Sequence, residues 1–111
     1  MEFNEYQKLA SRTAVFSGKQ AEFPLAYVAL GLAGESGELI EKIKKVLRNH
    51  DGIVSEEKRE AIKLEIGDCL WYLSQIARMC DISFDDAAKA NVAKLSDRAE
   101  RGVIKSEGDA R

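Results

Sequence analysis

Residues 25–47 read LAYVALGLAGESGELIEKIKKVL, and this stretch decides the fold. Its apolar residues recur at intervals of three and four, which predicts an amphipathic helix from about Leu25 to Leu47. Pro24 precedes it, at a position that the first turn of a helix accepts. The predicted apolar stripe consists of Leu25, Val28, Ala29, Leu32, Ser36, Leu39, Ile40, Ile43, Val46 and Leu47. We therefore expect a long helix with one apolar side.

Three further helices are expected, one before this stretch and two after it. One spans about Asn4 to Phe16, before a loop that contains Gly18 and Lys19. The next begins after Ser55, a good N-cap, and carries an apolar stripe as far as Cys80. The last begins at Ser83 with a capping-box-like pattern, and residues 102–111 form an irregular tail. Because clusters of β-branched residues with period-2 alternation are missing, the prediction is an all-α, four-helix chain with a single domain over residues 1–111.

The composition excludes several classes of partner. The 111 residues carry a formal net charge of −2, so a broad surface for polymeric nucleic acid is not expected. No apolar run approaches the roughly 18 residues of a membrane span. We expect a cytoplasmic protein that binds neither nucleic acid polymers nor membranes.

Two acidic motifs place carboxylates three residues apart, on one face of each long helix: Glu35-Ser36-Gly37-Glu38 and Glu65-Ile66-Gly67-Asp68. Both pairs flank their apolar stripes in the same rotational sense. The short connection over residues 49–55 favours an antiparallel hairpin, in which such flanks lie on one side and at one level. The sequence therefore predicts four carboxylates at one site.

Four adjacent carboxylates repel one another unless a cation compensates their charge. Oxygen ligands of this kind suit Mg²⁺, or Mn²⁺, with substrate phosphates completing the coordination. Glu38 lies farther from the apolar stripe than Glu35, so we expect Glu38 to act as the general base. The alternative is a solvated acidic face on which Glu38 pairs with Lys42, four residues on.

This pattern resembles the E-x-x-E…E-x-x-D signature of the MazG-like nucleoside triphosphate pyrophosphohydrolases. The segment YVALGLAGESG at residues 27–37, the segment KIKK at residues 42–45, and Asn91, Lys94 and Arg98 agree with that resemblance. The ending Gly108-Asp109-x-Arg111 is similar to that of the short, single-domain branch. The resemblance thus covers nearly the whole chain.

The resemblance implies a Mg²⁺ site formed by Glu35, Glu38, Glu65 and Asp68. It implies cleavage of a nucleoside triphosphate between the α- and β-phosphates, in the service of nucleotide-pool house-cleaning, by a homodimer or homotetramer. It also assigns an aromatic residue, here Tyr72, four positions after the last acidic residue. With the basic residues of the last helix, the expected substrate-binding residues are Tyr72, Asn91, Lys94, Arg98 and Arg101.

Some of these residues have an equally plain structural interpretation. Asn91 falls near the middle of the apolar face of the last helix, where a core hydrogen bond would also explain it. The basic residues of that helix suit the negative end of a helix dipole. Trp71 and Leu64 point away from the stripe of their helix, which predicts a subunit interface. The glycines at 31, 34 and 37 favour close helix packing.

Other functions remain open at this point. A non-catalytic helical oligomerisation or regulatory module explains the apolar stripes but not the matched carboxylates. A phosphoribosyl-ATP pyrophosphohydrolase or a dUTPase-type relative would use the same site on a different substrate. A di-iron bundle requires Glu-x-x-His motifs, and this sequence has none.

Overall fold

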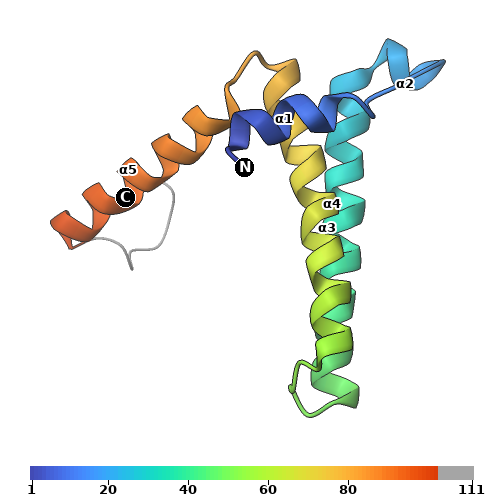
Figure 1. Cartoon of the computed structure of the whole chain (residues 1–111), viewed down its shortest axis with the longest axis vertical. Coiled ribbons are helices and arrows are strands. Elements are labelled where there is room, and N and C mark those ends of the chain that lie inside the picture. The colour runs from blue at the N-terminus through green and yellow to red at the C-terminus, as the bar shows by residue number, and fades with distance from the viewer. Residues whose placement is uncertain (103–111) are drawn as a thin grey trace.

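The computed structural model describes residues 1–102, which are helical and contain no strand. The elements are α1 (Phe3–Ser11), α2 (Lys19–Glu22), α3 (Pro24–Asn49), α4 (Glu56–Met79) and α5 (Phe84–Arg101) (Figure 1). The all-α prediction is confirmed, but residues 1–102 form five helices rather than four, because a single turn, α2, forms within the predicted loop. Of the predicted tail at 102–111, residues 103–111, which include the family-like ending, lie outside the described residues. No helix within residues 1–102 combines the length and apolar character that a membrane span requires.

Helices α3 and α4 form the predicted antiparallel hairpin, the longest part of the molecule (Figure 1). The turn between them uses left-handed backbone at Asp51 and Gly52, with φ of 51° and 76°. Ser55 then caps α4, its Oγ accepting a hydrogen bond from the backbone N–H of Lys58 at 3.2 Å. The turn residues and the cap therefore stop one helix and start the next as the sequence predicted.

The two helices meet along a line of residues spaced alternately four and three apart, the pattern of a coiled-coil seam. All of these residues are buried or half-buried: Val28, Leu32, Glu35, Leu39, Lys42 and Val46 of α3, and Lys58, Ile62, Glu65, Cys69, Tyr72, Ile76 and Met79 of α4. Glu35 and Lys42 thus lie in the seam itself, not beside it. The line of contact is rotated relative to the centre of the predicted stripe.

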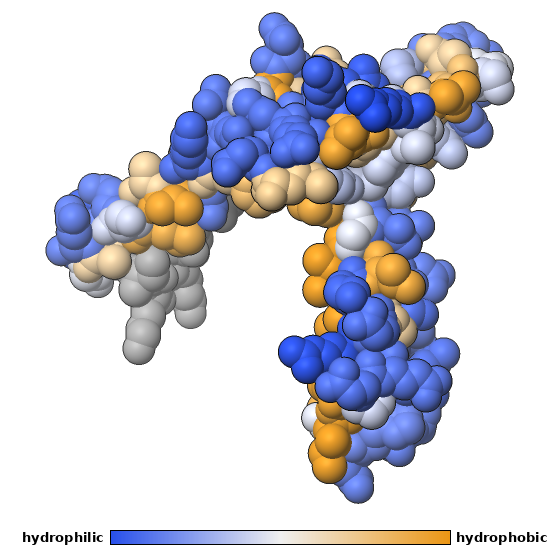
Figure 2. Space-filling view, viewed as in Figure 1, coloured by the Kyte–Doolittle hydropathy of each residue, from blue (hydrophilic) through white to orange (hydrophobic). Residues whose placement is uncertain are grey.

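The rotation leaves half of the predicted stripe outside the seam. Leu25, Ile40, Ile43 and Leu47 of α3, with Ile66 and Leu73 of α4, are each at least 44% exposed. On each helix, these residues are rotated about 60–120° from the seam in the same direction. In an antiparallel pair, that rotation places them all on one side of the hairpin. We call these six residues the bare face; Figure 2 shows apolar surface along the edge of the hairpin that is turned towards α5.

Helix α1 crosses the open end of the hairpin and packs on α4 (Figure 1). The indole N–H of Trp71 donates to the carbonyl of Ala10 at 3.1 Å and to Oγ1 of Thr13 at 2.9 Å. The sequence predicted a subunit interface at Trp71, and within residues 1–102 the N-terminal helix of the same chain contacts it there. Leu64, the other residue in that prediction, is 67% exposed.

Two amide side chains of α1 hold the junction between α4 and α5. Oδ1 of Asn4 accepts from Oγ of Ser83 and from the N–H of Asp85, both at 2.9 Å. Gln7 donates to the carbonyls of Ser74 and Ile82, each at 3.2 Å. Ser83 caps α5 through the N–H of Asp86, as predicted. From this junction α5 projects away from the hairpin (Figure 1).

Candidate metal and nucleotide site

Three of the four predicted carboxylates come together on the hairpin. One carboxylate oxygen from each of Glu35, Glu65 and Asp68 lies within 4.8 Å of the other two. Glu35 and Asp68 are similar numbers of residues from the turn, so antiparallel pairing sets them level across the seam. We call these three residues the carboxylate cluster. It is the group of side chains within residues 1–102 best suited to a cation.

Glu38, predicted as a fourth ligand and the general base, lies outside this group. Glu38 is exposed and lines an adjacent polar groove with Glu41, Lys42, Lys45, Lys58 and Ala61. The side chain of Glu38 is thus part of this lysine-lined groove and not of the carboxylate cluster.

Glu65 is a half-buried member of the carboxylate cluster. Its side chain is 15% exposed, and Oε1 lies 3.4 Å from the ammonium nitrogen of Lys42 on the opposite helix. Its other oxygen, Oε2, is buried and has no hydrogen-bond partner within residues 1–102. A buried carboxylate oxygen without a partner is costly unless something else binds it. The predicted alternative, a Glu38–Lys42 pair, is replaced by this ion pair across the hairpin.

The electrostatics of the cluster favour a bound cation. Burial, followed by the nearby charges of Asp68 and Glu65, raises the pKa of Glu35 above its usual value. Like charges at this spacing favour the protonated acid unless a positive ion compensates them. Three converging carboxylates, one with an orphaned buried oxygen, match the hard oxygen ligands that Mg²⁺ and Mn²⁺ take. The residues present therefore fit a divalent cation.

Aromatic side chains form the wall beside the cluster. Glu35, Asp68, Trp71 and Tyr72 line an open cavity of about 270 Å³. The two rings meet edge to face, with centroids 5.0 Å apart. Burial, followed by Tyr27, Glu35 and Asp68, raises the pKa of the Tyr72 phenol, so it stays a neutral hydrogen-bond donor at neutral pH. A flat ring or a sugar fits such a wall next to the carboxylates.

Gly31 explains how Tyr72 reaches this position. A Cβ on residue 31 would overlap the Tyr72 ring. Close packing, the predicted reason for the helical glycines, is therefore confirmed for this one. At Gly34 and Gly37 a Cβ would meet nothing within 4 Å, so close packing within residues 1–102 does not explain them.

The predicted substrate contacts of α5 are not brought to the cluster within one chain. Helix α5 contacts α1 and α4, but not α3, which carries Glu35. Asn91 is exposed rather than buried in an apolar face, and Lys94 is exposed too. Arg101 pairs with Asp97 at 2.8 Å, whereas Arg98 is buried. These residues do not reach the carboxylate cluster of their own chain because the α4–α5 junction directs α5 away from the hairpin (Figure 1).

Sequence reasoning missed two residues near the cluster. Lys42 was considered only as a partner for Glu38 and as part of the KIKK segment, although the four-three spacing from Val28 could have placed it in the seam. Tyr6 of α1 lies close enough for the Asp68 charge, after burial, to raise the pKa of its phenol. The sequence around Tyr6 does not predict its proximity to Asp68, because α1 reaches the site only through tertiary packing.

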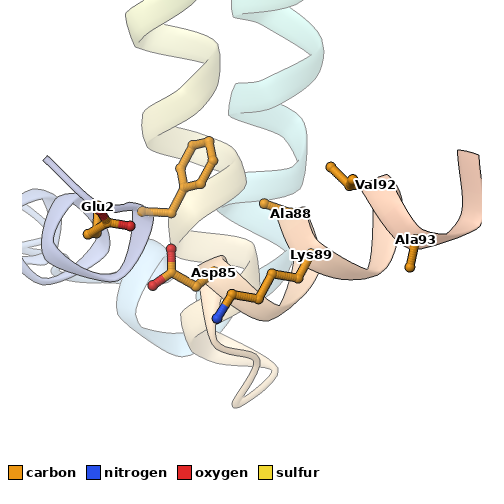
Figure 3. A pocket seen from close by; sticks show the side chains of 7 residues that line it. Glu2, Asp85, Ala88, Lys89, Val92 and Ala93 are labelled. Carbon is orange, nitrogen blue, oxygen red and sulfur yellow. The ribbon is translucent and has the colours of Figure 1, made fainter. Parts of the chain in front are cut away.

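A second, more apolar cavity of about 420 Å³ lies between the start of α1 and α5 (Figure 3). Its lining consists of Glu2, Phe3, Asp85, Ala88, Lys89, Val92 and Ala93. Phe3 meets Phe84 edge to face at 5.2 Å, which joins the two helices at this point. Val92 is 63% exposed at its rim, so this cavity continues the apolar surface of α5.

Comparison with known proteins shows which family this sequence resembles. The family model described as the MazG nucleotide pyrophosphohydrolase domain matches residues 24–103, a range that includes the whole carboxylate cluster and begins after α1. The chain is 40% identical over 114 residues to the Gene 37 protein of Mycobacterium phage L5, and the alignment covers 100% of both chains. No solved structure was found to match.

Proposed function

Because the chain belongs to the MazG nucleotide pyrophosphohydrolase family, we propose that it hydrolyses a nucleoside triphosphate to the monophosphate and pyrophosphate, with Mg²⁺ as cofactor. The observation that carries this proposal is the convergence of Glu35, Glu65 and Asp68 within 4.8 Å. Mn²⁺ is the expected substitute. We expect the protein to act in the cytoplasm, in nucleotide-pool house-cleaning.

Glu35, Glu65 and Asp68 are the residues that would hold the cation. When bound, the cation neutralises phosphate charge and acidifies the attacking water. Glu38, exposed beside the cluster, is the carboxylate left to accept the proton of that water. Tyr72 and Trp71 offer the nucleoside an apolar wall with a phenol as donor.

The active form is a homodimer, or a dimer of dimers, joined through the bare face. The chain exposes 8109 Å², about 2,000 Å² more than the roughly 6,100 Å² typical of a compact monomer of its mass. An excess of this size is comparable with what each subunit buries in an obligate dimer, about 1,000–2,500 Å². The hairpin and α5 both present apolar surface to the open space between them (Figure 2).

A partner also resolves the position of α5. Since this helix points away from its own hairpin, its polar residues can serve a carboxylate cluster only in another subunit. We place Asn91, Lys94, Arg98 and Arg101 there as contacts for the triphosphate. The charges of Lys94, Arg98 and Arg101 would neutralise phosphate oxygens that the cation leaves unpaired, and the amide of Asn91 would add a neutral hydrogen bond.

A product assay tests the proposal. The purified protein is incubated with a panel of ribo- and deoxyribonucleoside triphosphates, including dUTP, and with phosphoribosyl-ATP, in the presence of Mg²⁺. We expect pyrophosphate, and no activity in EDTA or in Asp68→Asn. Orthophosphate as the product would contradict the reaction type. No product from any substrate would favour a non-catalytic oligomerisation module.

A further inference from the structure

Lys42 is a half-buried residue of the seam between α3 and α4. Its side chain is 35% exposed, and its nitrogen lies 3.4 Å from Oε1 of Glu65. The neighbouring lysines are different: Lys44 and Lys45 pair with Glu41 on their own helix, at 3.0 Å and 4.0 Å, and their side chains are about half exposed. Lys42 alone among these three reaches across to a member of the carboxylate cluster.

We propose that Lys42 is the resident counter-ion of the carboxylate cluster and that it limits the affinity of the site for divalent cations. Without a cation, it neutralises part of the charge on Glu65. With a cation, it opposes the second positive charge. This inference rests on the proposed function, because it assumes that the cluster binds a divalent ion.

The geometry allows both positive groups at once. Lys42 approaches Oε1 of Glu65, whereas Oε2 is buried and without a hydrogen-bond partner within residues 1–102. A cation held by Oε2 together with Glu35 and Asp68 would therefore lie a few ångströms from the ammonium. Two like charges at that range repel strongly, more so in a partly buried seam than in water.

Charge and packing roles of Lys42 predict different results when the lysine is replaced. A neutral residue removes repulsion from the cation and support from the empty site. The neutral residue should therefore stabilise the metal-bound state and destabilise the metal-free state. A residue that merely joined the two helices would weaken the fold and leave the metal affinity alone. A residue that bound the substrate phosphate would raise KM and leave the metal affinity alone.

The test is calorimetric titration of the full chain with Mn²⁺ in the absence of nucleotide, with thermal unfolding in EDTA beside it. Lys42→Met and Lys42→Gln should bind Mn²⁺ about three- to tenfold more tightly than the wild type, and should melt at a lower temperature in EDTA. Lys42→Arg should restore the wild-type affinity. Lys44→Met, which alters an exposed lysine paired with Glu41, is the matched control and should change neither measurement.

Two outcomes would separate the failure of this inference from that of the proposed function. Equal or weaker Mn²⁺ binding by both neutral variants, beside normal binding by the wild type, would overturn the role of Lys42 and leave the metal site standing. If the wild type bound no Mn²⁺, the metal site would fall and the counter-ion with it. Lys42→Gln retains polar length, so the comparison survives if Lys42→Met fails to fold.

Discussion

The two sides of the α3–α4 hairpin differ in almost every respect. The acidic side carries Asp68 and Glu38, an aromatic wall, and the covering helix α1. The bare face consists of aliphatic residues that remain 44–68% exposed within residues 1–102. Both sides come from the same two helices with the same periodicity. The difference shows that an apolar stripe does not by itself define a core: one part of it closes the hairpin, and the rest remains to be covered.

The largest effect is expected from removing one charge on the acidic side. Glu35→Gln should lower kcat/KM by at least about 100-fold, since a lost metal ligand costs several kcal/mol of transition-state stabilisation. Because it also removes like-charge repulsion, the melting temperature in EDTA should not fall. Glu41→Gln, on the same helix and paired with Lys44, is the control and should keep its activity. Full activity in Glu35→Gln would remove that residue from the site.

A charge placed on the bare face should break the dimer. Ile40→Asp would bury an unpaired carboxylate in the interface, costing several kcal/mol and weakening self-association by about 100-fold or more. Leu64→Asp is the matched control: Leu64 is 67% exposed and Ile40 64%, but Leu64 lies on the acidic side. Light scattering after size exclusion measures the difference. A wild type that elutes as a monomer, or equal behaviour of the two variants, would refute the bare face as an interface.

Two glycines on α3 should respond in opposite directions. Gly31→Ala forces a methyl group into the Tyr72 ring and should cost about 1–3 kcal/mol of unfolding free energy. Gly34→Ala meets nothing within 4 Å in the described chain and should stabilise by up to about 1 kcal/mol through helix propensity. Urea denaturation of both variants provides the comparison. If Gly34→Ala destabilised instead, a partner subunit would be the first place to seek the contact.

The smallest effect is a pH dependence that only the acidic side should show. The pKa of Glu35 is raised in the folded state above its ordinary 4.5, so the folded chain binds more protons than the unfolded chain just above that value. Stability of the metal-free protein should therefore fall as the pH rises from 4.5 through the raised pKa. Saturating Mg²⁺, or Glu35→Gln, should flatten this slope. Thermal melts between pH 4 and 7 measure it, and an unchanged slope in Glu35→Gln would assign it elsewhere.

Sequence reasoning reached the hairpin and the level of the site because both depend on local information. Helical period, the Ser55 cap and a short turn fix which residues lie opposite one another along an antiparallel pair. Rotation about the helix axis was harder. A broad apolar stripe can be centred on several neighbouring lines, and the line chosen decides whether Glu35 and Lys42 lie in the seam or beside it. The contact between α1 and Trp71 was missed for another reason, since α1 lies far away in the sequence and its packing is a long-range property.

By itself, the sequence determined an all-helical chain, an antiparallel hairpin and two acidic motifs at one height, because spacing, capping and connectivity act between near neighbours. Only the tertiary structure decided which half of the stripe became the seam, which carboxylates converge, and that Lys42 pairs with Glu65. It also decided that α5 leaves the hairpin, because Asn4 and Gln7 hold its first turn from a helix some 80 residues earlier in the chain. Such choices depend on which surfaces fit together in three dimensions, and no local pattern records them.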